Sequence, residues 1–310
     1  MRRLCTRLIT GTLLLSSSSS PMLHSAGNPK SGSAAAVVPV HSARLSPLDL
    51  EVGGDLAGLP PGTTLYVSRD ALLTLPQTVF TVTDDANFTA SSQISGVLLQ
   101  DLFQQLGAAP DADLIVAICR DQYNGHYPRG YVAAHHPLLV LAINGKPPAE
   151  WPKNAEVHGG NMGPYMISHP RFSPRFKVLA HSDEPQIPWG VVRLEFRNQK
   201  TVFGAIAPSG PHAAEPAVQD GYRIAQQNCF RCHNMGREGG HKASRPWLVL
   251  SAMASASPDY FAAYVRNPLA GNKDAQMSGN PAYDDATTRA LVAYFETFTS
   301  QEKEKQGQKP

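Results

Sequence analysis

Two cysteines and a histidine fall within five residues of this chain, in the segment Cys229-Phe230-Arg231-Cys232-His233. On a helix, positions i, i+3 and i+4 share one face, so these three side chains would project from the same side. The two thiols and the imidazole can then all reach one flat partner. This segment constrains the possible folds and cofactors of the chain more than any other segment does.

C-x-x-C-H is the attachment sequence for c-type haem. Both thiols can bond to the vinyl groups of one porphyrin while the imidazole rises toward the iron. We therefore predict that Cys229 and Cys232 bind one covalent haem c and that His233 is an axial ligand. The alternatives are a redox disulfide and half of a zinc site, which do not require a histidine directly after the second cysteine.

The first residues predict export to the periplasm. Three arginines fall within the first seven residues and precede an apolar run, residues 8–15, and then a run of serines. This pattern is typical of a signal peptide, so we assign residues 1–36 to a signal peptide and leader. Residues 27 to about 55 lack periodicity and predict a flexible leader. A short membrane anchor is the alternative. The run is far shorter than the ~20 residues that span a bilayer, so no stable membrane span is expected.

Length and charge limit the other classes of function. A chain of 310 residues with 42% hydrophobic residues favours two domains with their own cores. The formal net charge of +2, without a long basic run, argues against nucleic acid as a partner. Of the four cysteines, Cys5 leaves with the signal and two hold the haem. Cys119 is left unpaired, so the mature chain has no structural disulfide.

Strand patterns dominate residues 56–204. Short runs of β-branched and apolar residues, bounded by turn residues, predict strands at residues 64–67, 78–82, 114–118, 138–143 and 191–196. Asn144-Gly145 predicts a tight turn, and one helix is expected over residues 91–107. Residues 56–204 are therefore predicted to form an α+β domain.

The end of the chain has a different pattern. Residues 205–217 hold three prolines without periodicity and predict a linker. Helical patterns follow at residues 220–228, 258–266 and 284–298, so we expect an all-α domain over residues 218–299. Residues 300–310 are polar and predict a disordered tail.

The all-α part resembles a class I cytochrome c over residues 218–299. In that family a glycine and an aromatic residue on the first helix cross the C-terminal helix, and a methionine far downstream is the sixth iron ligand. Gly221 and Tyr222 stand at the first-helix positions, and Tyr294 or Phe295 would pack against them. Glycine at the crossing permits close approach.

The resemblance implies that Met277 is the second axial ligand. It follows a loop long enough to pass around the ring and precedes the final helix. Met235 is too close to His233 to reach the opposite face, and Met253 falls where a packing helix is expected. His241 or an open sixth position are the rivals. The usual Met-Pro pair is Met277-Ser278 here, which makes the loop less rigid than in the family.

Two residues after the motif have roles that the resemblance implies. Pro246 stands where the family has a proline whose carbonyl accepts a hydrogen bond from the axial histidine, although a simple loop proline is the alternative. The neighbouring Trp247 would either donate to a haem propionate or lie buried in the core.

Residues 75–197 resemble the sulfite oxidase-like molybdopterin-binding fold. The segments that carry the likeness are the strand and turn at 138–147 and the loop Asp121-Gln122-Tyr123, in which glycine is replaced by Gln122. In that family a loop cysteine binds molybdenum, and Cys119 lies at a strand end where such a ligand could sit. We favour a buried hydrophobic role for Cys119 and no pterin, because the arginines are scattered.

These observations favour a non-catalytic electron carrier: a periplasmic monohaem cytochrome c that passes single electrons between redox partners. The alternative is a molybdenum-dependent oxidoreductase, similar to a sulfite dehydrogenase, that sends electrons to the fused haem. A third hypothesis is a module that docks the cytochrome to a larger respiratory complex. The adjacent His135 and His136 would point to opposite faces of a strand and would make a poor metal site.

Overall fold

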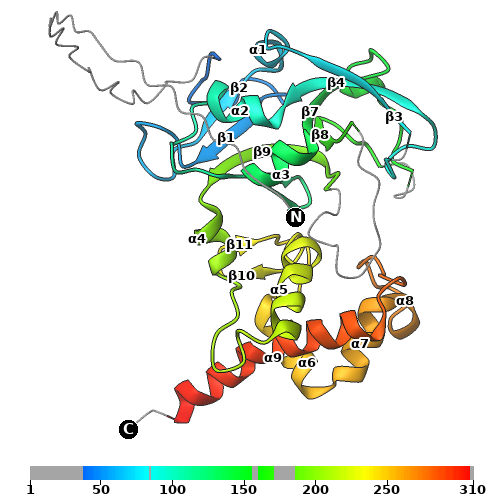
Figure 1. Cartoon of the computed structure of the whole chain (residues 1–310). Helices are drawn as coiled ribbons and strands as arrows, with labels where there is room; N and C mark the ends of the chain where they lie inside the picture. The colour runs from blue at the N-terminus through cyan, green and yellow to red at the C-terminus, as the bar shows by residue number, and fades with distance from the viewer. Residues whose placement is uncertain (1–37, 84, 156–159, 171–185, 308–310) are drawn as a thin grey trace, which may run out of the picture. The chain divides into compact units, whose positions relative to one another are not determined.

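The structure, a computed structural model, describes residues 38–83, 85–155, 160–170 and 186–307. The predicted signal peptide lies outside these residues. A strand-rich α+β region comes first in the chain and helices follow, as the colours of Figure 1 show. The predicted fold class is therefore confirmed. Among the described residues, no helix combines the length and the apolar character that crossing a membrane requires.

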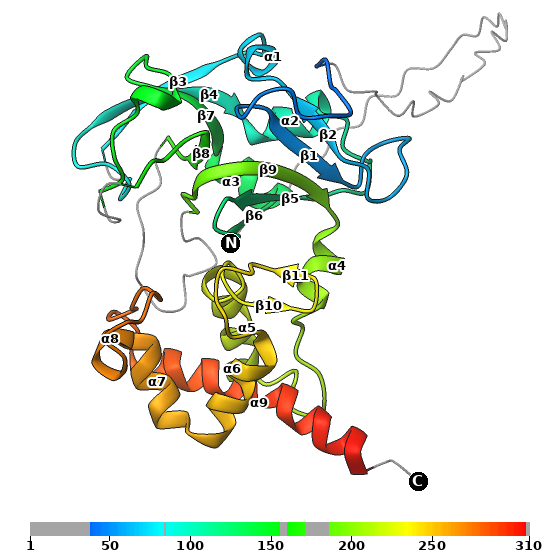
Figure 2. The same cartoon turned by 180° about the vertical axis from the view of Figure 1, so that it is seen from behind.

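Nine strands of the described region form one sheet. They are β1 (Leu50–Gly54), β2 (Leu65–Val67), β3 (Thr78–Val82), β4 (Ser92–Leu98), β5 (Leu114–Cys119), β6 (Asn124–Pro128), β7 (Leu138–Ile143), β8 (Tyr165–Ser168) and β9 (Trp189–Arg197). The order is β2-β1-β9-β8-β7-β4-β3, and β5 pairs with both β9 and β6. Figure 2 shows β5, β6 and β9 side by side. Only the β1–β9 pair in this sheet is parallel among the described strands.

The predicted strands at β2, β3, β5, β7 and β9 are confirmed, and so is the tight turn after β7. Asn144 has φ 51° and Gly145 has φ 72°, the left-handed pair that a two-residue hairpin turn requires. β7 is apolar throughout because both of its faces are buried. Leu139 and Leu141 enter one hydrophobic cluster, and Leu138 and Val140 enter another.

Two predictions about the first third of the chain are wrong. Residues 50–54 are not a flexible leader but strand β1, in which Leu50 and Val52 are fully buried. Residues 91–107 are not one helix: β4 occupies 92–98, and the helix α2 (Leu99–Gln105) begins only after it. Gly96 explains this difference, because β7 runs so close that a Cβ there would overlap the Leu139 carbonyl.

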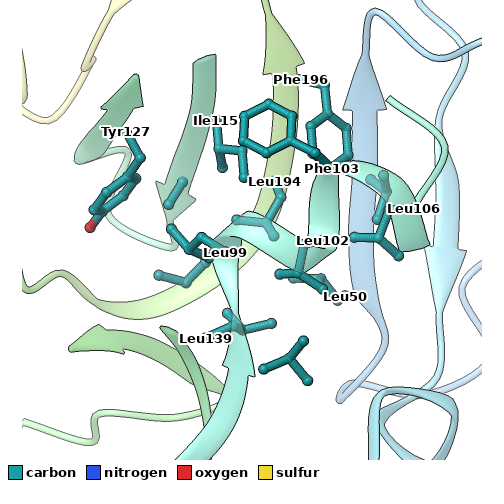
Figure 3. Packing of buried hydrophobic residues seen from close by; sticks show 14 of the residues in the cluster. Leu50, Leu99, Leu102, Phe103, Leu106, Ile115, Tyr127, Leu139, Leu194 and Phe196 are labelled. Carbon is teal, nitrogen blue, oxygen red and sulfur yellow. The ribbon is translucent and has the colours of Figure 1, made fainter. Parts of the chain in front are cut away.

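Short helices cover the sheet in this region. They are α1 (Arg69–Leu73), α2, α3 (Arg129–His135), the 3₁₀ turn η1 (Pro148–Glu150) and α4 (Gln199–Gly204). Figure 3 shows Leu99, Leu102 and Phe103 of α2 directed at sheet residues such as Leu194 and Phe196. The rings of Phe103 and Phe196 are 5.5 Å apart. This cluster is the main core of the α+β region.

The helical region contains α5 (Pro216–Asn228), α6 (Trp247–Ala256), α7 (Pro258–Arg266), α8 (Pro268–Gly271) and α9 (Asp285–Gly307), with a short hairpin of β10 (Asn234–Met235) and β11 (Glu238–Gly239). The three predicted helices are present. The hairpin means that this region is not purely helical, and α9 continues to Gly307 where a disordered tail from residue 300 was expected.

The predicted linker, residues 205–217, is not a free spacer. Ile206 is fully buried, and the Tyr294 hydroxyl of α9 donates to its carbonyl at 2.6 Å. Tyr222 of α5 donates to the Phe203 carbonyl at 2.9 Å, and α5 itself already begins at Pro216. The prolines of this segment break any periodic pattern, so the sequence did not indicate that Ile206 is buried.

Candidate functional site

The C-x-x-C-H segment forms the turn that directly follows α5. Cys229 caps this helix, and its carbonyl accepts hydrogen bonds from the amides of Cys232 at 3.1 Å and His233 at 2.9 Å. These i+3 and i+4 bonds continue the helical path for one more turn. The three side chains therefore share one side of that turn, as the spacing predicts.

His233 is held by a hydrogen bond on one ring nitrogen. Its Nδ1 lies 2.6 Å from the Arg245 carbonyl, and only 9% of the residue is exposed. Burial lowers the pKa of His233, so the ring is neutral near pH 7. A neutral imidazole that donates through Nδ1 keeps the Nε2 lone pair for a metal.

The acceptor of this bond is Arg245, and the prediction that Pro246 supplies it is wrong. Pro246 is the N-cap of α6, and its own carbonyl accepts from the amides of Val249 at 3.0 Å and Leu250 at 3.3 Å. The helix uses the proline carbonyl, so the carbonyl one residue earlier is free to accept from His233.

The crossing of α5 and α9 is as the resemblance implies. A Cβ on Gly221 would overlap the Ala290 carbonyl and the Cβ of Tyr294, so only glycine allows the two helices to come this close. Of the two expected partners, Tyr294 stacks on Tyr222, with ring centroids 5.7 Å apart. This crossing fixes the end of α5, where the motif begins.

Met277 lies in the segment between α8 and α9. Two hydrogen bonds from Asn280 to the Val265 carbonyl, at 3.1 and 3.3 Å, hold this segment against α7. Asn228, the last residue of α5, donates to the Tyr283 hydroxyl at 2.7 Å and ties the other side. Met277 is half-buried and packs on the same apolar cluster as Cys229. These bonds anchor the segment of Met277 on both sides.

Of the rival ligands, Met235 and Met253 are half-buried against the same hydrophobic cluster as Met277. His241 is exposed. Met253 lines an open apolar groove of about 520 Å³ on α6, together with Leu248 and Tyr260. Met235 is half-buried in β10, close to His233 in the chain. Met277 as the second ligand stays a prediction, supported by its anchored segment.

Trp247 lies in the core of the helical region. It is fully buried, and its ring packs edge-on against Phe230 of the motif at 5.4 Å and against Phe295 at 5.0 Å. Its indole Nε1 meets no hydrogen-bond partner among the described residues, so donation from Trp247 to a haem propionate stays a prediction.

The other sequence candidates lie outside the C-x-x-C-H turn itself. Cys119 is buried in the sheet core, and desolvation raises the pKa of its thiol far above the usual range. His135 and His136 end helix α3 instead of lying on a strand, as the sequence suggested. No group of three or more histidine, cysteine or acidic residues within the described ranges is placed to hold a metal ion.

Sequence reasoning missed the contribution of the α+β region to this site. The Asn124 amide donates to the Arg231 carbonyl of the motif at 2.9 Å, and the His126 ring stacks on Phe230 at 5.3 Å. The one available signal was the Asp121-Gln122-Tyr123 loop, which precedes these residues. Its resemblance to a cofactor-binding fold does not predict a contact with the haem-attachment segment.

Comparison with known proteins agrees with the geometry of the helical region. Residues 216–295 match the family described as cytochrome c oxidase, cbb3-type, subunit III. No curated protein matches the chain. Among solved structures, the chain is similar to the sulfane dehydrogenase SoxCD from Paracoccus pantotrophus, with 16% identity and a TM-score of 0.33. That alignment covers 51% of this chain and 40% of the SoxCD chain, so it spans less than half of the relative. The chain therefore carries a cytochrome c domain at residues 216–295, behind an α+β region.

Proposed function

We propose that this protein is a periplasmic monohaem c-type cytochrome that transfers single electrons between redox partners. The observation that carries the proposal is one helical turn that brings Cys229, Cys232 and His233 together, with His233 Nδ1 held by the Arg245 carbonyl. This donor set fits haem c: two thiols for attachment and one imidazole nitrogen free for iron.

Each residue of the proposed haem site has a separate role. Cys229 and Cys232 would attach the haem, and His233, through Nε2, and Met277 would bind its iron. The haem, when bound, supplies a reversible one-electron couple. The Arg245 carbonyl fixes the orientation of the His233 ring and raises its basicity as a ligand. A thioether at the sixth position favours the ferrous state and leaves no open site for a substrate, so the site favours outer-sphere electron transfer.

The proposal is tested by a reductive titration of the purified full chain from a host that matures c-type cytochromes. We expect one electron per polypeptide, taken up reversibly, with the sharp absorption bands of a low-spin ferrous haem. A protein that shows no haem bands, or that takes up no electron in the accessible range of potentials, would contradict it.

The N-terminal sequence supports a location for this protein, and the matching family supports a class of partner. The export pattern of residues 1–36 supports a periplasmic protein, and the oxidase subunit named by the matching family supports docking to a respiratory complex. Cell fractionation with a periplasmic marker tests the first point. Co-purification from native membranes tests the second, and recovery of the protein only in the cytoplasm would contradict the location.

A molybdenum-dependent oxidoreductase is the alternative function, and the residues present do not fit it. The metal would need the Cys119 sulfur as a thiolate. Cys119 is only 4% exposed and lies within the hydrophobic cluster of the sheet, so its sulfur is enclosed by apolar side chains. We therefore derive no step through molybdenum.

A further inference from the structure

A turn of the α+β region lies against the haem-attachment segment. We call residues 119–124, which join β5 to β6, the docking turn. It is closed by two hydrogen bonds of 2.9 Å, from the Cys119 amide to the Tyr123 carbonyl and from the Gln122 amide to the Cys119 carbonyl. Gln122 has φ 65°, a left-handed conformation that a non-glycine residue adopts only when its surroundings require it.

The docking turn binds the cytochrome domain through the main chain. The Asn124 amide donates to the Arg231 carbonyl at 2.9 Å, and its side-chain Nδ2 donates to the Gly239 carbonyl at 2.9 Å. In the opposite direction, the His241 amide donates to the Gln122 carbonyl at 3.0 Å. Asn124 thus holds both the attachment segment and the hairpin that follows it.

The carbonyls at the end of α5 show why this contact matters. A helix leaves its last carbonyls without partners inside the helix, and buried carbonyls need other donors. The cytochrome domain satisfies Cys229 with the His233 amide, Phe230 with the Gly240 amide and Cys232 with the Ala243 amide. The Arg231 carbonyl, in the middle of the motif, receives its bond from Asn124.

The hairpin that Asn124 also holds is wrapped tightly over the motif. A Cβ on Gly240 would overlap the Arg231 carbonyl, and one on Gly239, at φ 88°, would press on the Phe230 ring and the His233 carbonyl. The hairpin and the motif are therefore in direct backbone contact. We expect a displacement of Gly239 to displace the backbone of His233 as well.

Side chains seal the same contact from water. Phe230 is fully buried, and its ring lies 5.3 Å from the His126 ring of β6 and 6.3 Å from the Phe203 ring of α4. Leu114 and Val116, on the face of β5 that turns away from the sheet core, belong to the same hydrophobic cluster. The haem-attachment segment is thus buried against the α+β region.

From these contacts we infer that Asn124 is a positioning residue of the haem site, through which the α+β region fixes the attachment segment and thereby the reduction potential of the haem. This rests on the proposed function. Without the Asn124 amide group, the Gly239 carbonyl loses its donor and water takes that place beside the motif. Water near the iron stabilises the more highly charged ferric state, so the potential falls.

The test compares Asn124→Ala with Asn87→Ala in the full chain, by spectroelectrochemical titration of the midpoint potential. Asn87 is a matched control because its Nδ2 also donates to a main-chain carbonyl, that of Ile187, at 2.9 Å within the α+β region. We expect a lower midpoint potential for Asn124→Ala and an unchanged one for Asn87→Ala. Equal potentials in Asn124→Ala and wild type would overturn the inference, and so would an equal fall in both variants.

A second measurement uses only the wild-type holoprotein and does not depend on how well the variant folds. Amide hydrogen exchange should show the Asn124 and His241 amides protected as strongly as those in the β5–β6 pair, because both are bonded across the contact. Exchange at the rate of an exposed loop would overturn the inference. If the wild type holds no covalent haem, the proposed function fails, while the exchange pattern still reports on the docking turn.

Discussion

At the scale of single residues, the sixth iron ligand is the sharpest prediction. Met277→Ala should lower the midpoint potential and remove the weak sulfur-to-iron charge-transfer band, because water or nitrogen ligands stabilise ferrous iron less than a thioether does. Met253→Ala is the control, since Met253 lines a groove on α6. An unchanged spectrum in Met277→Ala together with an altered one in Met253→Ala or His241→Ala would show that the assignment is wrong.

His126 should make the stability of the protein depend on pH. Its ring nitrogens meet no hydrogen-bond partner among the described residues, and burial, together with the charges of Arg231 and Arg197, lowers its pKa to about 3. Between pH 6.5 and 3 the unfolded chain binds a proton here that the native state does not. The free energy of unfolding is therefore unaffected by the titration of His126 above pH 6.5. Below pH 6.5 it falls by up to about 1.4 kcal/mol per pH unit.

The variant His126→Phe tests this, because phenylalanine keeps an aromatic ring between Phe203 and Phe230 and cannot be protonated. Urea unfolding at pH 7.5 and pH 5 should show a smaller loss of stability at pH 5 for the variant than for the wild type. His169, whose pKa burial also lowers to about 3, contributes equally in both proteins. Identical losses in the two proteins would contradict the prediction.

The sequence predicted the attachment residues because their spacing alone places them on one turn. It could not identify Arg245 as the partner of His233, because that depends on which carbonyl the following helix consumes. Pro246 looks suitable in the sequence, yet α6 starts there and takes its carbonyl. Asn124 is more than a hundred residues from Arg231 in the chain, so no local pattern connects them.

At the scale of elements, the crossing of α5 and α9 should not tolerate a larger residue. Gly221→Ala places a methyl group against the Ala290 carbonyl and Tyr294, so we expect a loss of about 1–3 kcal/mol in unfolding free energy. Gly204→Ala in α4 is the control, because a Cβ there meets nothing within 4 Å. Urea titrations of both variants measure the difference, and equal stabilities would refute close packing at Gly221.

Elements with a single strong pattern were predictable, and those with two competing patterns were not. The run Leu138–Ile143 consists of six apolar residues, a pattern that indicates a buried strand. Residues 92–98 fit both alternation and a helical face, and only the approach of β7 to Gly96 decides between them. β1 ends in Gly53 and Gly54, a residue type that strands disfavour, and it is recognised by its pairing with β2 and β9.

At the scale of the whole molecule, the order of an α+β region and a helical cytochrome domain was predictable, and their attachment was not. The linker composition suggested that they are independent. In the structure Phe230, Ile206 and Val218 share one hydrophobic cluster with residues of β5 and α4. Which faces meet is decided by contacts far apart in the chain, and a single sequence does not show them.

The cytochrome domain alone should therefore be less stable than the full chain. Residues 205–310 behind a foreign signal peptide would expose Phe230, whose burial contributes about 1.5–3 kcal/mol. We expect a lower melting temperature of the haem-loaded domain, followed by its absorption spectrum. Phe230→Ala in the full chain should lower the melting temperature in the same direction, and full stability of the isolated domain would show that the contact is not structural.

Covalent attachment of haem is the central claim, and extraction of denatured protein tests it most directly. The full chain, matured with its own N-terminal signal, is denatured and treated with acidified organic solvent. The account predicts that haem remains with the wild-type polypeptide and leaves it in the double variant Cys229→Ala, Cys232→Ala. Haem that leaves the wild-type protein with the solvent would contradict the account.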